Sequence, residues 1–159
     1  MKTSPKIFVA LPVIDELDFL PNTINCILNQ SYQNYTIYVI VNQADSWWEN
    51  INKKEICLRN KATIEWLYSL NNDKIKIIDK SSRGKGWSDK EAGVGIARKT
   101  VMDNIIKFAD NDDYIVSMDA DTSFNYDYFE NIIKAFVENK KAVGLSVPYY
   151  HKLTGNNKA

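Results

Sequence analysis

The chain is poor in the residues that build several common kinds of site. It has one histidine, His151, and two cysteines, Cys26 and Cys57, among 159 residues. One imidazole cannot supply a zinc site that needs several histidines, and two thiols cannot make a disulfide scaffold. No apolar run approaches the ~18 residues that cross a bilayer. Because residues 1–6 are polar and unlike a secretory signal, we expect reduced thiols in a cytoplasmic protein, with a peripheral position at the inner membrane face as the alternative.

Net charge and the common phosphate-binding loops are also missing. Twenty basic and twenty acidic side chains cancel, so the total charge does not favour a polyanion, and we expect no nucleic-acid partner. The sequence contains no Gly-x-x-x-x-Gly-Lys-Ser/Thr loop. Gly84 and Gly86 begin a Gly-x-Gly pattern, but Asp89 stands where the dinucleotide fingerprint has glycine or alanine. Neither a P-loop nor a dinucleotide site is predicted.

The sequence does contain an alternation of strand-like and helix-like segments. Nearly continuous apolar runs predict strands covered on both faces, at residues 7–11, 35–41, 75–78, 114–118 and 142–147. Apolar stripes at steps of three and four predict helices, at residues 16–28, 47–70, 89–108 and 126–139. We therefore predict a single α/β domain over residues 1–159, with a Rossmann-like, mostly parallel sheet flanked by helices.

The sharpest local signal is the pair Asp119 and Asp121, which follows the fourth predicted strand. Residues two apart on a strand point to the same side, so both carboxylates are directed to one place. Two like charges at close range are relieved by a cation or a shared proton. Mg²⁺ or Mn²⁺ is the natural counter-ion, because these ions prefer carboxylate, phosphate and water oxygens. An acidic turn in which Asp121 only caps a helix is the alternative.

Several segments together resemble a known family. They are residues 7–12 leading to Asp15 and Glu16, the turn at residues 84–86, the helix at residues 93–98, and residues 116–121. In this order they resemble the nucleotide-sugar-binding half of a family 2 glycosyltransferase of GT-A fold, over residues 6–149. The resemblance implies that the acidic pair is the DxD motif, whose metal bridges a nucleotide diphosphate.

The resemblance implies a role for each residue of the predicted site. Asp119 and Asp121 would hold Mn²⁺ or Mg²⁺, and Asp119 would also meet the nucleotide sugar. The remaining donor-binding residues would be Pro12, Val13 and Glu16 beside the nucleoside, Asn42 and Gln43 at the base, and Lys85 and Arg98 near the phosphates. The two amides replace the acidic residue usual at that position, and they can still offer uracil a donor and an acceptor, so a UDP-sugar is favoured. A solvated position is the alternative for either cation.

The resemblance also implies that these residues are the donor-binding half of a hexosyltransferase. Members of the family continue into an acceptor-binding half with the catalytic carboxylate for inversion, whereas this sequence ends soon after the fifth predicted strand. We therefore expect a truncated domain with weak or no transfer by itself, and a sugar or lipid-linked acceptor only in a full-length form. An apolar sheet edge around residues 143–150 would then be exposed and favour self-association.

The carboxylates outside the acidic pair fall into two groups. Asp15 and Asp45 remain candidates for a base that deprotonates an acceptor hydroxyl. The cluster at residues 110–113 is predicted to be a solvated turn at the opposite end of the fourth strand.

Two other functions stay open. One is a non-catalytic nucleotide-binding fragment. The other is a phosphatase, because residues 116–121 also resemble the first motif of haloacid-dehalogenase-type phosphatases, in which the first aspartate is a nucleophile toward phosphate.

Overall fold

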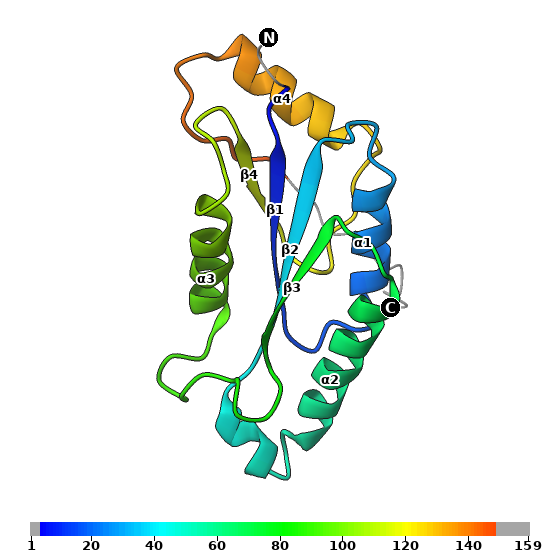
Figure 1. Ribbon diagram of the computed structural model, residues 1–159, viewed down its shortest axis with the longest axis vertical. Helices are drawn as coiled ribbons and strands as arrows, with labels where there is room; N and C mark the ends of the chain where they lie inside the picture. The colour runs from blue at the N-terminus through cyan, green and yellow to red at the C-terminus, as the bar shows by residue number, and fades with distance from the viewer. Residues whose placement is uncertain (1–3, 149–159) are drawn as a thin grey trace, which may run out of the picture.

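The computed structural model describes residues 4–148. Four parallel strands form one sheet in the order β3-β2-β1-β4 (Figure 1). The strands are β1 (Ile7–Val13), β2 (Tyr35–Asn42), β3 (Ile75–Lys80) and β4 (Tyr114–Ser117). The helices are α1 (Leu20–Leu28), the 3₁₀ turn η1 (Asp45–Glu49), α2 (Lys54–Ser69), α3 (Val94–Ile106) and α4 (Tyr128–Glu138). The predicted α/β architecture is confirmed.

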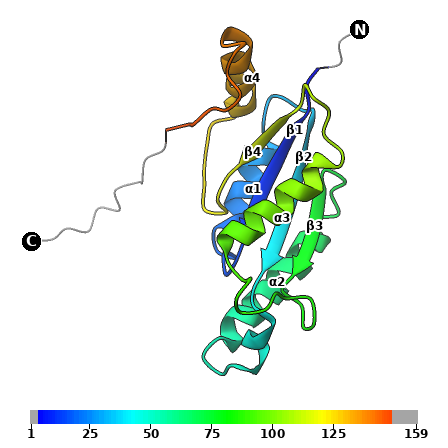
Figure 2. The same ribbon diagram turned by 90° about the vertical axis from the view of Figure 1, so that its left-hand side faces the viewer.

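Alternating strand residues divide the core into two layers. Val9 and Leu11 of β1 face one side, where they join the buried residues of α1, α2 and α4. Phe8 and Ala10 of the same strand face the other side, where they pack against α3. Figure 2 shows α3 in front of the sheet and α1 behind it. Because both faces are covered, β1 and β2 are buried along their whole length, which explains their continuous apolar runs.

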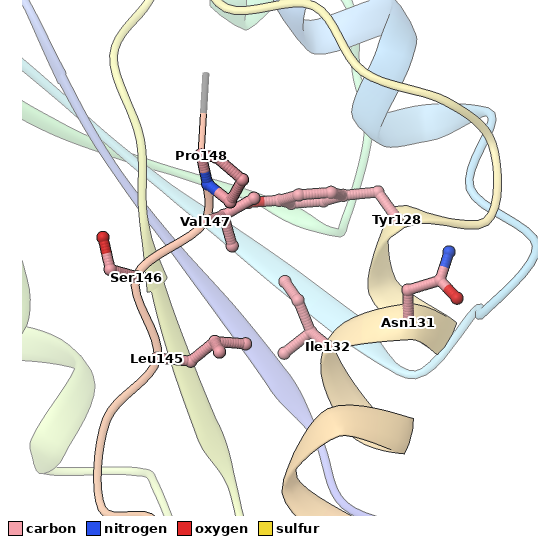
Figure 3. A pocket seen from close by; sticks show the side chains of 7 residues that line it. All are labelled: Tyr128, Asn131, Ile132, Leu145, Ser146, Val147 and Pro148. Atoms are coloured by element: carbon pink, nitrogen blue, oxygen red, sulfur yellow. The ribbon is translucent and has the colours of Figure 1, made fainter.

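The fifth predicted strand is wrong. Residues 142–148 form no strand and pair with none of the described ones. Val143 is fully exposed, and Leu145 and Val147 are 50% and 41% exposed. The segment runs beside α4, where a small apolar hollow lies between Leu145 to Pro148 and the side chains of Tyr128 and Ile132 (Figure 3). An apolar run indicates a preference for extended backbone, whereas a strand also needs a partner in register, and none of residues 4–148 provides one for this segment.

The predicted helix at 47–70 is divided into η1 and α2. The side chain of Asn50 accepts a hydrogen bond from the backbone N–H of Asn52, at 3.0 Å. Such a local side-chain bond stabilises a turn in competition with helix. The helical backbone is therefore interrupted after η1, and α2 begins only at Lys54.

Helices α1 and α3 begin later than their apolar stripes predict. The left-handed Asp15 precedes α1, and Pro21 occupies its first turn. A separate turn precedes α3, in which the Ser88 hydroxyl donates to Glu91 at 2.8 Å. None of the helices in residues 4–148 is long and apolar enough to cross a membrane.

Candidate functional site

A hollow of about 360 Å³ with both charged and apolar lining residues lies at the carboxyl ends of β1 and β4. Its lining residues are Pro12, Ile14, Glu16, Val94, Arg98, Asp119, Ala120 and Asp121. The chain runs from β1 to β2 and β3 on one side, and returns through α3 to β4 on the other side of β1. The strand order therefore reverses at β1 and β4. Ligands of open α/β sheets bind at the carboxyl ends of the strands at such a point.

The two carboxylates of the acidic pair line one hollow, although β4 ends at Ser117 and Asp121 belongs to a turn rather than to a strand. Met118 and Ala120 are buried, at 7% and 3% exposure, whereas Asp119 and Asp121 between and after them are exposed and line the hollow. The buried Thr23 hydroxyl lies 2.6 Å from the carbonyl oxygen of Ala120, to which it donates. Helix α1 thus holds the turn that carries the two carboxylates.

One cation already faces this pair. Arg98, on the second turn of α3, forms an ion pair with Asp119. Its Nε atom is buried and has no hydrogen-bond partner among residues 4–148. Asp121 makes no ion pair within the same described range. Arg98 therefore has donor capacity left, and Asp121 has an unneutralised charge.

The third acid of the hollow experiences this excess negative charge. The pKa of Glu16 is raised above its ordinary value of 4.5, chiefly by burial and then by the charges of Asp121, Asp15 and Asp119. Arg59 opposes the shift without cancelling it. A raised carboxyl pKa beside other carboxylates marks a site that a cation would stabilise.

Comparison with known proteins agrees with this geometry. The sequence profile described as glycosyl transferase family 2 matches residues 8–159. The chain belongs to this family. Comparison with curated proteins gives no match.

A solved structure supports the family's fold. The crystal structure of S. aureus TarS 1-349 superimposes on the chain with a TM-score of 0.57 and 14% sequence identity. The match covers 91% of this chain and 38% of the TarS chain, so the chain spans well under half of that structure. At this identity the likeness concerns the fold alone, and the parallel sheet flanked by helices matches the Rossmann-like part of the GT-A fold.

The hollow brings together only part of the residues that the family resemblance implies. Pro12, Glu16, Arg98, Asp119 and Asp121 line it. Val13 does not, because it is 1% exposed and packs in the core behind the sheet. The donor-binding roles of all these residues stay predictions.

Asn42 and Gln43 also lie away from the hollow. They are 2% and 1% exposed. The Asn42 amide donates to the carbonyl oxygen of Val13 at 3.0 Å, and the Gln43 amide donates to the Cys57 sulfur at 3.1 Å. The structure therefore gives both amides partners inside the protein, and a base contact would require these bonds to open.

Lys85 is engaged at the end of β3. Its ammonium group lies 2.9 Å from the Asp79 carboxylate. Burial works to raise the pKa of Asp79, but hydrogen bonds from Ser82, Lys85 and Ser81 outweigh it and hold the pKa well below the usual range. The loop around Lys85 is thereby fastened to β3.

The remaining acids have structural partners. Asp15 pairs with Arg59, and Asp45 accepts the backbone N–H of Gly84 at 2.7 Å. At the opposite end of the sheet, Asp113 accepts the backbone N–H of Lys6 at 2.7 Å, so this residue joins β1 to β4 rather than being only solvated. Neither of the two base candidates lines the hollow.

Sequence reasoning missed Ile14 and Val94, which form the apolar wall of the hollow. Val94 begins α3 at the correct edge of the sheet, and this place in the chain could have indicated it. Asn60 was missed as well. It is a buried polar residue on the apolar face of α2, beside Cys57 and Ile64, and such an interruption is the available signal.

Proposed function

We propose that this family 2 chain binds a nucleotide-diphosphate sugar, with a UDP-sugar favoured, as the donor for inverting transfer of the sugar to an acceptor hydroxyl. A divalent cation would be held by Asp119 and Asp121. The observation that carries the proposal is the meeting of these carboxylates with Arg98 and Glu16 in one hollow at the switch point of the sheet.

The residues present fit a hard cation with an incomplete protein shell. Within residues 4–148 no group of three or more His, Cys, Asp or Glu side chains is arranged to hold a metal. Two carboxylates are nevertheless the usual protein share for Mg²⁺ or Mn²⁺, which complete their shells with water and phosphate oxygens. The raised pKa of Glu16 is consistent with the fit, because the charges of Asp121, Asp15 and Asp119 contribute to it after the larger effect of burial. When bound, the cation would neutralise charge that develops on the departing diphosphate.

Arg98 and the start of α3 supply the anion-binding part of the proposal. The guanidinium offers planar donors suited to phosphate oxygens, and its buried Nε lacks a partner among the described residues. The first turn of α3 adds backbone N–H groups that have no partner within the helix, together with the positive end of the helix dipole. Its first residue, Val94, lines the hollow. Together these groups would orient the diphosphate against the acidic pair.

Pro12 and Ile14 form an apolar wall on the other side of the hollow. We propose that the nucleoside packs against this wall, next to the Glu16 carboxylate. Since Asp15 and Asp45 are held by Arg59 and Gly84, we propose neither as the base for the acceptor. The chain acts as a single donor-binding domain, with weak or no transfer by itself and with the sugar or lipid-linked acceptor handled elsewhere.

Titration calorimetry tests this function. UDP-glucose and GDP-mannose are titrated into the chain with Mn²⁺, and again with EDTA. We expect binding with Mn²⁺ and a loss of most of the affinity with EDTA, with the UDP-sugar the tighter ligand. Equal binding in EDTA would contradict the metal part of the proposal, and no binding of either donor would contradict the function. Binding without any transfer in a full-length form would favour the non-catalytic alternative.

We also propose self-association through the apolar surface beside β4. Val143, Leu145 and Val147 are exposed, and Ile115 of the edge strand is 38% exposed. Exposed apolar patches next to an open sheet edge favour association. Sedimentation velocity over a concentration series tests the proposal, and a sedimentation coefficient that stays at the monomer value would contradict it.

A further inference from the structure

Asp15 has an unusual backbone conformation at a sensitive place. Its φ angle is 58°, in the left-handed region. A residue other than glycine adopts this conformation at a cost in free energy and keeps it only when its surroundings hold it. Asp15 stands between Ile14 and Glu16, which both line the hollow. Its conformation therefore determines how these two side chains face a ligand.

The side chain of Asn60 holds this conformation from inside the protein. Its Oδ1 atom accepts the backbone N–H of Asp15 at 2.8 Å. Asn60 is fully buried, and its amide group donates to Gln43 Oε1 at 2.8 Å. Both ends of the side chain are therefore used, and the orientation of the amide is set by Gln43, which directly follows β2.

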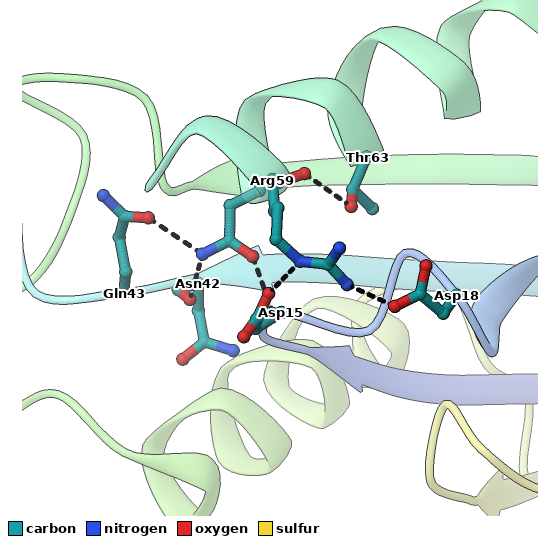
Figure 4. Close-up of polar contacts among 7 residues, drawn as sticks. Asp15, Asp18, Asn42, Gln43, Arg59 and Thr63 are labelled. Carbon is teal, nitrogen blue, oxygen red and sulfur yellow. Dashed lines mark hydrogen bonds and ion pairs between the residues drawn. The ribbon is translucent and has the colours of Figure 1, made fainter. Parts of the chain in front are cut away.

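The neighbouring Arg59 holds the same loop from outside. Its guanidinium pairs with the carboxylates of Asp15 and, at 2.8 Å, of Asp18 (Figure 4). Consecutive residues of α2 thus bind the backbone and the side chain of Asp15. On the far side of Glu16, its carbonyl oxygen accepts the backbone N–H of Leu20 at 2.8 Å. Glu16 is therefore fixed from both directions, by α2 before it and by α1 after it.

We propose that Asn60 is a positioning residue for the donor site: its bond to the Asp15 N–H holds the β1–α1 loop so that Ile14 and Glu16 face the nucleotide. The inference rests on the proposed function for the identity of the ligand. It also explains why Asn42 and Gln43 are buried, because these amides and Asn60 form a hydrogen-bonded cluster that joins the ends of β1 and β2 to α2.

The test compares Asn60→Ala with Thr63→Val. Thr63 is also fully buried on α2, and its hydroxyl bonds only to the Arg59 carbonyl oxygen, at 2.9 Å, within the same helix. Amide hydrogen exchange by NMR reports the Asp15 N–H directly, and calorimetry with UDP and Mn²⁺ reports the site. We expect Asn60→Ala to lose protection at Asp15 and about tenfold in UDP affinity, the lower end of the effect of outer-shell partners. Thr63→Val should keep the protection at Asp15 and the UDP affinity of the wild type.

Retained protection at Asp15 in Asn60→Ala, or equal UDP affinities in the two variants, would overturn the inference. If Asn60→Ala does not fold, Asn60→Ser replaces it, because serine keeps a polar group in the buried position but its side chain is too short to reach the Asp15 N–H. That variant should raise exchange at Asp15 and weaken UDP binding, and unchanged values would contradict the proposal. Failure of the wild-type chain to bind UDP would instead refute the proposed function, while exchange at Asp15 would still decide what holds the loop.

Discussion

The Arg98 guanidinium is paired with the Asp119 carboxylate across the hollow, so one acid of the pair faces a cation before any ligand arrives. A metal ion and a diphosphate would act on this pair in opposite ways. A bound metal ion would compete with Arg98 for Asp119 and would be repelled by its charge. A bound diphosphate would attract Arg98 and draw it from the acid. Arg98 would therefore link the two proposed binding events.

This relationship predicts opposite effects of Arg98→Met on two affinities. Without the competing cation, Mn²⁺ alone should bind about two- to fivefold more tightly, the scale of a partly exposed ion pair. With Mn²⁺ present, UDP should bind at least about tenfold more weakly, because charge-assisted bonds to phosphate are lost. Calorimetry measures both affinities.

Lys99→Met is the matched control for this experiment. Lys99 follows Arg98 on α3 and pairs with Asp103 on the exposed side of the helix. The substitution makes the same change in net charge, and neither affinity should change appreciably. Two shifts in the same direction for Arg98→Met would show that its pairing with Asp119 does not govern the site.

The raised pKa of Glu16 predicts a pH-dependent stability. The folded chain retains a proton that the unfolded chain releases near pH 4.5, the ordinary carboxyl value. The free energy of unfolding should therefore fall as the pH rises from that value through the folded pKa. Glu16→Gln removes this loss, so the variant should be more stable than wild type at pH 7, with the difference vanishing below pH 4.5.

Urea unfolding at pH 4 and pH 7 measures the effect of Glu16→Gln. Glu65→Gln serves as the control, since Glu65 is an exposed acid on α2 that makes only a surface pair with Lys61. A wild-type chain more stable than Glu16→Gln at pH 7 would contradict a Glu16 pKa raised by burial and by the neighbouring acids.

Replacing Gly86 or Gly95 with alanine should change the free energy of unfolding in opposite directions. A β-carbon at Gly86 would lie 2.7 Å from the backbone nitrogen of Asp45, too close for the loop to stay in place. Gly86→Ala should cost about 1–3 kcal/mol, the scale of an overpacked site. A β-carbon at Gly95 meets nothing within 4 Å, so Gly95→Ala should stabilise α3 by up to about 1 kcal/mol. Urea unfolding measures both, and equal effects would contradict the close approach at Gly86.

The sequence alone predicts the sheet, because the apolar run of a strand such as 7–11 is a local pattern. Asp119 and Asp121 do line one hollow, but β4 ends at Ser117, so the turn after the strand places them and not the two-residue period of a strand. Local patterns do not reveal whether an extended segment finds a partner, which is why the strand at 142–147 was predicted wrongly.

The sequence alone also did not predict the hydrogen-bond partners of the polar side chains. Gln43 follows a strand that ends at the ligand edge, which favours a ligand contact. Its partner Asn60 lies 17 residues further on and reaches it only because α2 packs behind β2. In the same way Lys85 forms an ion pair with Asp79, and this pairing depends on the conformation of the loop that joins them. Such contacts follow from packing, and no spacing rule predicts them.

The central claim is that Asp121 helps to hold a cation shared with a nucleotide diphosphate, and one comparison tests it most directly. UDP is titrated by calorimetry, with Mn²⁺ and with EDTA, into wild type, Asp121→Asn and Asp112→Asn. Asp112 is exposed at the opposite end of β4, and Asp112→Asn changes the net charge by the same amount as Asp121→Asn. The account predicts that Asp121→Asn loses at least about tenfold of the Mn²⁺-dependent affinity, while Asp112→Asn keeps it. Equal Mn²⁺-dependent affinities in the two variants would contradict the account.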